Sequence, residues 1–138
     1  MISLNELLSG NDPKTLPQEH LDSLNVLLDK VNKVRTAWAK PMTVTSGYRS
    51  MAHHLEIYKA KGITDPKKIP MHSKHLYGQA VDIADADGSL KKWCVANENL
   101  LRAIGLWMED FKTTTTWVHF QCVPYGSYKV GGSLWFIP

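Results

Sequence analysis

Residues 73–83 read SKHLYGQAVDI, a polar turn that runs into a short apolar strand. Gly78 lets the chain turn tightly, and residues 79–84 alternate and are rich in β-forming side chains, as a strand requires. On that strand Asp82 points away from the face that carries its two apolar neighbours. A carboxylate on a buried strand needs a partner, and a metal ion is one such partner.

Two histidines complete a possible metal site with Asp82. His75 lies at the end of the same turn, and His119 lies in a second alternating segment, residues 117–122, opposite to the face of its apolar neighbours. A zinc site for hydrolysis uses three protein ligands and keeps a fourth position open for water. The alternative is that a histidine is a surface or hydrogen-bonded core residue, which we expect for His20, His53, His54 and His72.

The remaining segments predict the secondary structure around these residues. Apolar periodicity and capping residues predict helices over residues 3–8, 16–40, 50–60 and 89–104, with Ser3 and Ser89 as N-caps. Short strands are expected over residues 42–45, 79–84, 106–109 and 117–122, and the tail from Pro124 is expected to be rich in turns. This order predicts one α+β domain, residues 1–138, with helices packed on one face of a small, mostly antiparallel sheet.

Composition limits the class of protein. The 138 residues suffice for one compact domain, and a content of 43% hydrophobic and 21% charged residues excludes a disordered chain. The net charge of +3 favours approach to an anionic polymer such as a cell wall. The Lys and Arg residues are scattered, however, and form no nucleic-acid-binding tail. Cys94 and Cys122 lack CxxC spacing and lie in apolar patterns, so we expect two reduced core thiols.

The N-terminal segment MISLNELLSGNDPK has neither a positively charged start nor a long apolar stretch, so we expect no secretory signal peptide. No apolar run approaches the roughly 20 residues that span a bilayer. We therefore expect a monomeric protein that is made in the cytoplasm, does not insert into a membrane and needs another factor to release it.

Residues 73–82 match every fixed position of the motif SxHxxGxAxD, and the chain thereby resembles the zinc D-Ala-D-Ala metallopeptidases. This group includes bacterial dipeptidases and carboxypeptidases and phage endolysins that cut between L-Ala and D-Glu; the hedgehog signalling domain shares its fold. Trp117-Val118-His119 resembles the family's second histidine segment. Ser46-Gly47-Tyr48-Arg49-Ser50 resembles its SGYRS-like turn.

The resemblance implies roles for individual residues. It implies one zinc ion held by His75, Asp82 and His119, and an arginine, Arg49, that faces the carboxylate of the substrate. The substrate that it implies is the peptide stem of bacterial peptidoglycan. Further candidates for substrate binding are Ser73 and Trp117.

One position departs from the family pattern. Many relatives carry a catalytic Glu or Asp three residues before the last zinc histidine, where this chain has Thr116. The nearest upstream acids are Glu109 and Asp110, and strand alternation places Glu109 on the same face as His119. We therefore expect Glu109 to be the general base, with Asp110 as the second candidate. The alternative is that both are exposed hairpin acids.

The single domain, the missing signal peptide and the basic charge suit a phage or prophage lysis enzyme. Such a protein acts on the cell wall after release from the cytoplasm or as part of a virion. Thr116 favours the alternative function, which is a catalytically weakened, zinc-containing module that binds the cell wall or belongs to a virion tail.

Overall fold

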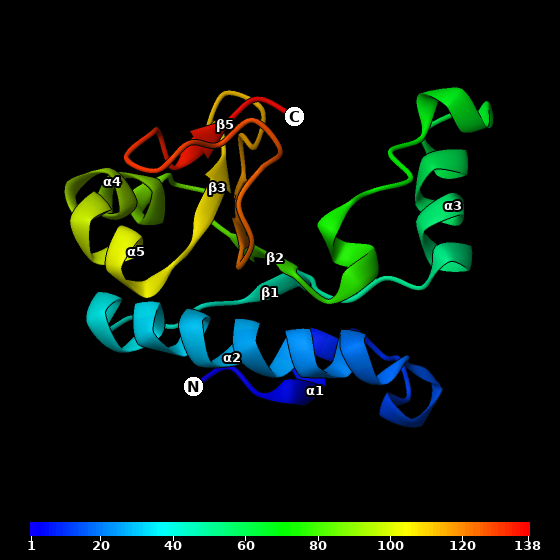
Figure 1. Ribbon diagram of the computed structural model, residues 1–138, viewed down its shortest axis with the longest axis horizontal. Helices are drawn as coiled ribbons and strands as arrows, with labels where there is room; N and C mark the ends of the chain where they lie inside the picture. The colour runs from blue at the N-terminus through cyan, green and yellow to red at the C-terminus, as the bar shows by residue number, and fades with distance from the viewer.

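The alternating segments of the chain form five strands in one open sheet (Figure 1). The computed structural model describes residues 1–138, and the strand order is β1-β2-β4-β3-β5. The strands are β1 (Val44–Ser46), β2 (Ala80–Ala84), β3 (Trp107–Glu109), β4 (Trp117–Gln121) and β5 (Trp135–Phe136). All neighbouring strands are antiparallel except β3 and β5, which are parallel, so the predicted α+β class with a mostly antiparallel sheet is confirmed.

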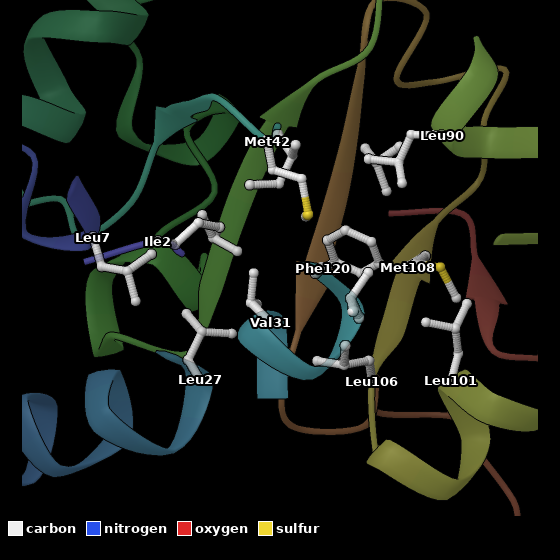
Figure 2. Packing of buried hydrophobic residues seen from close by; sticks show 14 of the residues in the cluster. Ile2, Leu7, Leu27, Val31, Met42, Leu90, Leu101, Leu106, Met108 and Phe120 are labelled. Atoms are coloured by element: carbon white, nitrogen blue, oxygen red, sulfur yellow. The ribbon is translucent and has the colours of Figure 1, made fainter. Parts of the chain in front are cut away.

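Four helices and one face of the sheet enclose the hydrophobic core. The α-helices are α1 (Leu4–Leu8), α2 (Gln18–Trp38), α3 (Met51–Ala60), α4 (Ser89–Ala96) and α5 (Glu98–Ile104), and short 3-10 helices are η1 (Pro13–Thr15), η2 (Pro66–Lys68) and η3 (Lys74–Tyr77). Val31 of α2 and Leu101 of α5 lie in one buried cluster with Met108 and Phe120 of the sheet (Figure 2). Helix α3 contributes no residue to this cluster and stands apart from the other helices (Figure 1). The opposite face of the sheet therefore stays free for a site.

The predicted helix over residues 89–104 is wrong as a single element. The chain leaves helical geometry at Asn97, where φ is −118° and ψ is 31°, and α4 and α5 are separate helices. The N-cap prediction for Ser89 is also wrong, because Gly88 precedes the helix and Ser89 is its first residue. Instead, the buried carboxylate of Asp85 accepts hydrogen bonds from the backbone N–H groups of Leu90 and Lys91, each at 3.0 Å.

Other predicted boundaries agree with the structure to within a few residues. Ser3 caps α1 in a capping box with Glu6, as expected. Helix α2 begins and ends two residues inside its predicted range, and its last turn is closed by Ala39 in the left-handed conformation. The predicted strand 42–45 lies two residues later along the chain at its start, as β1.

The turn-rich tail contains a strand that the sequence analysis did not predict. Strand β5 joins the free edge of β3, because the backbone N–H of Met108 donates to the carbonyl of Leu134 at 2.9 Å and that of Asp110 donates to Phe136 at 2.8 Å. The side chain of Leu134 is buried in the core. The C-terminal segment is thereby fixed beside the face of the sheet that the helices leave free.

The two cysteines are free thiols, as predicted. Cys94 is fully buried, and burial raises its pKa to about 12, so the thiol stays protonated and unreactive. Cys122 is partly buried, and burial raises its pKa as well. None of the helices has the length and apolar character that crossing a membrane requires.

Candidate metal centre

Strand pairing brings the predicted ligands together on the free face of the sheet. Asp82 of β2 and His119 of β4 are directly opposite in the antiparallel register, and His75 lies on η3 just before β2. The carboxylate atom Asp82 Oδ1 lies 2.9 Å from His119 Nδ1 and 3.3 Å from His75 Nε2. One ligand atom from each residue lies within 4.8 Å of the others, and the two histidines are buried. The geometry is that of a compact three-ligand metal site.

A hydrogen bond at Nδ1 of His75 orients the ring so that Nε2 faces Asp82. His75 Nδ1 lies 2.9 Å from the backbone carbonyl oxygen of Gly47. Because a carbonyl only accepts hydrogen bonds, Nδ1 carries the proton and Nε2 keeps its lone pair for a metal. Gly47 can hold this carbonyl in place because it has no side chain: a Cβ there would lie 2.2 Å from the carbonyl oxygen of Leu7.

Gln121 fixes the orientation of His119 in the same way. The side-chain amide nitrogen of Gln121 donates to the carbonyl of Val123 at 2.8 Å, so its oxygen Oε1 points toward His119 Nε2, 3.0 Å away. His119 Nε2 therefore carries the proton and His119 Nδ1 faces Asp82 with its lone pair available. No sequence motif assigns a role to Gln121, although strand alternation places it on the same face as His119.

The electrostatics of the cluster favour a bound cation. Burial opposes ionisation of Asp82, but when the nitrogens that face it, His119 Nδ1 and His75 Nε2, carry protons, their hydrogen bonds hold the pKa of its carboxyl well below the ordinary value. Burial also opposes protonation of His119, yet the carboxylates of Asp82 and Glu109 raise its pKa overall. A buried carboxylate that stays ionised between two imidazoles attracts a proton or a metal ion to the same place.

The donor set fits zinc. Two imidazole nitrogens and one carboxylate oxygen are a common ligand set for catalytic zinc, and each histidine is anchored through its other nitrogen, as in well-formed zinc sites. This fit rests on the arrangement of the side chains alone.

The ligands lie in a groove of about 1060 Å³ that also receives the predicted substrate-binding residues. Arg49, Ser73 and Trp117 all line this groove. The Arg49 guanidinium lies 3.8 Å from Asp82 Oδ2 and is held by a 3.1 Å hydrogen bond from its Nε to Ser46 Oγ. These positions suit contact with a substrate, and the three roles stay predictions.

The two candidate bases occupy different environments. Glu109 lines the groove, and its Oε1 lies 3.8 Å from His119 Nδ1. Asp110 does not line the groove, and its carboxylate accepts a hydrogen bond from the backbone of Lys112 in the following turn. The exposed Thr116 offers no carboxylate. The geometry favours Glu109 over Asp110, and the assignment of Glu109 as the general base stays a prediction.

An α+β sheet with a buried His-Asp-His cluster at the floor of an open groove, beside a carboxylate, defines a candidate mononuclear metal hydrolase. The family model described as Peptidase M15 matches residues 3–121 of the chain, and the chain belongs to this family of zinc metallopeptidases. The matched residues include the three candidate ligands, the two candidate bases and the predicted substrate-binding residues. The comparisons with curated proteins and with solved structures found no match.

Proposed function

We propose that this protein is a zinc-dependent peptidase that hydrolyses bonds in the peptide stem of bacterial peptidoglycan. The observation that carries the proposal is the convergence of His75 Nε2, an Asp82 oxygen and His119 Nδ1 at the floor of the groove, in a chain that belongs to a peptidase family. The bond is either that cut by D-Ala-D-Ala carboxypeptidases or the L-Ala–D-Glu bond cut by endopeptidases.

The proposed division of labour follows from the positions of the side chains. His75, Asp82 and His119 would hold one zinc ion. When bound, zinc supplies Lewis-acid chemistry: it polarises a carbonyl group and makes water more acidic. Glu109 would accept a proton from the attacking water and deliver it to the departing amine, because its carboxylate lies at the rim of the ligand cluster.

Arg49 would fix the register of the substrate. Its guanidinium can form two parallel hydrogen bonds with a carboxylate of the peptide, and the bond to Ser46 orients it toward the ligands. A lysine at this position would offer a point charge without the planar fork. Ser73 and Trp117 line the same groove and would contact the peptide.

The biological setting that we propose is lysis of a bacterial cell by a phage or prophage. The protein would be made in the cytoplasm as a monomer and reach the wall after release, or act as part of a virion. The net charge of +3 supports approach to an anionic wall.

The test is hydrolysis of purified cell walls by the zinc-loaded protein. We expect the release of new amino termini, and mass spectrometry of the products identifies the bond. Zinc content should be near stoichiometric in the wild type and largely lost in His119→Ala. If the zinc-loaded wild type releases no amino termini from walls or from synthetic stem peptides, the peptidase proposal is wrong.

The departure at Thr116 supports the second candidate, a wall-binding or virion tail module with little catalysis. Sedimentation with insoluble walls separates the two functions. A protein that sediments with walls, holds zinc and releases no amino termini has the binding function.

A further inference from the structure

The C-terminal segment, residues 122–138, lies outside the matched family region but forms one wall of the groove. We refer to it as the C-terminal arm. Its groove-lining residues carry no charged side chain, and they are Tyr125, Gly126, Ser127, Trp135, Phe136, Ile137 and Pro138. Any ligand that contacts this wall meets aromatic and aliphatic surface.

The arm is held firmly against the sheet. The parallel register pairs Phe136 of β5 with Glu109 of β3, so both side chains project from the same face. Tyr125 stacks on Phe136 with ring centroids 5.1 Å apart, and its hydroxyl donates to the carbonyl of Ser133 at 2.7 Å. The Phe136 ring centroid lies 6.1 Å from that of His119. The aromatic pair therefore borders the metal ligands.

Core packing does not explain the aromatic pair. Leu134, two residues before Phe136, is buried at 1% exposure, whereas Phe136 and Tyr125 are only partly buried and face the groove. Both aromatic rings also lie outside the hydrophobic core cluster. Their free surface is available to a ligand.

One row of side chains crosses the free face of the sheet from edge to edge. The pairings Ser46 with Asp82, Asp82 with His119 and Glu109 with Phe136 each join neighbouring strands. The register of β3 and β4, in which Met108 pairs with Phe120, places Glu109 beside His119. Arg49, bound to Ser46, lies at one end of the row and the aromatic pair lies at the other.

We propose that Phe136 and Tyr125 form an apolar subsite for the part of the substrate on the amino side of the cleaved bond. This inference rests on the proposed function, in which Arg49 binds a carboxylate on the other side. The Phe136 ring centroid lies 6.1 Å from that of His119, which is about the length of two residues of extended peptide. The subsite therefore takes an aliphatic side chain one or two residues before the cleaved bond.

The experiment uses the zinc-loaded full chain and peptides that share one cleavable bond. The peptides are extended one residue at a time on the amino side and end in an aliphatic residue. We expect kcat/KM of the wild type to rise when the extension reaches the aromatic pair. In Phe136→Ala this gain, about tenfold, is lost, so the longer peptides are cut no faster than the shortest one.

Two further variants keep the result interpretable. Val130→Ala changes a fully exposed residue of the same arm that does not line the groove, and it should behave as the wild type. Phe136→Leu keeps an apolar side chain and should retain part of the gain. Thermal unfolding and zinc content of each variant show whether the arm remains folded against the sheet.

Three results would overturn the subsite. The first is an equal loss by Phe136→Ala on short and long peptides, the second is an undiminished gain, and the third is a loss confined to peptides extended on the carboxyl side. Calorimetric binding of the same peptides to the zinc-loaded Glu109→Gln variant tests the subsite without turnover. If the wild type cuts no peptide but Glu109→Gln binds long peptides in a Phe136-dependent way, the proposed function fails and the subsite stands.

Discussion

Replacing Gln121 by leucine should weaken zinc binding without touching a ligand. In the wild type, Gln121 Oε1 accepts the proton of His119 Nε2 at 3.0 Å, which leaves Nδ1 facing Asp82. In zinc-free Gln121→Leu, the imidazole can move its proton to Nδ1, where Asp82 accepts it. Zinc binding at Nδ1 would return the proton to a buried Nε2 that has no acceptor.

The cost of leaving the N–H of His119 Nε2 without an acceptor determines how much zinc affinity is lost. Leaving a buried donor unsatisfied costs about 1–3 kcal/mol, and His119 is 4% exposed, so little water can replace the lost acceptor. At 1.4 kcal/mol per decade, this corresponds to a loss of roughly 5–140-fold in zinc affinity, which brackets the roughly 10–100-fold loss found when residues that hydrogen-bond to metal ligands are removed.

Competition with a chromophoric zinc chelator at one fixed pH measures the change. Gln121→Glu is the matched control, because it keeps the acceptor for His119 Nε2 and loses the donor to Val123. We expect Gln121→Glu to bind zinc at least as tightly as the wild type. Zinc binding by Gln121→Leu that is as tight as in the wild type, or an equal loss of affinity in both variants, would refute this role of Gln121.

Three other predictions concern separate parts of the site. Gly47→Ala should destabilise the fold by about 1–3 kcal/mol, because a Cβ at this position would lie 2.2 Å from a backbone oxygen of α1. Gly126→Ala is the control, because a Cβ there meets nothing within 4 Å. Chemical denaturation measures the unfolding free energy of both variants. Burial lowers the pKa of His54, so the unfolded chain binds a proton that the folded one does not, and the unfolding free energy should fall as pH drops through about 6.5. His54→Gln should flatten this slope, and an unchanged slope would exclude His54 as its source. Glu109→Gln should lower kcat on stem peptides by roughly 10²–10⁴-fold with zinc retained, and Asp110→Asn should not; the reverse pattern would make Asp110 the base.

The resemblance of residues 73–82 to a family motif, together with strand alternation, explains why the ligand set could be predicted. The motif around His75 and Asp82 is local, and the face of His119 follows from the apolar residues on either side of it. The opposition of Asp82 and His119 in the sheet is a register between distant segments, which alternation alone does not specify. The hydrogen bond from Gln121 depends on a side-chain rotamer and on the position of Val123, and no sequence pattern encodes either.

The missed features all depend on contacts between distant segments. Apolar spacing continues from Leu90 through Cys94 to Leu101, so periodicity did not indicate the break at Asn97. Strand β5 is two residues long, and an apolar segment of that length cannot be distinguished from a turn without its partner strand. His54 is fully buried with its Nε2 2.7 Å from the carbonyl oxygen of Pro70, while Leu55 on the same helix is 39% exposed, so hydrophobicity alone does not identify the buried residue of this helix.

The row of side chains across the sheet gives a physical reason why the chain can lack an acid at Thr116. A carboxylate three residues before His119, at the position of Thr116, would have to reach the cluster from the start of the same strand, β4. Glu109 reaches the same cluster from the neighbouring strand, β3. The register of β3 and β4 places it beside His119, one strand spacing away. Its Oε1 is 3.8 Å from His119 Nδ1, so a carboxylate on the neighbouring strand is close enough for the role of general base that we propose for Glu109. The proposed mechanism needs a carboxylate in that row, and either strand could supply it.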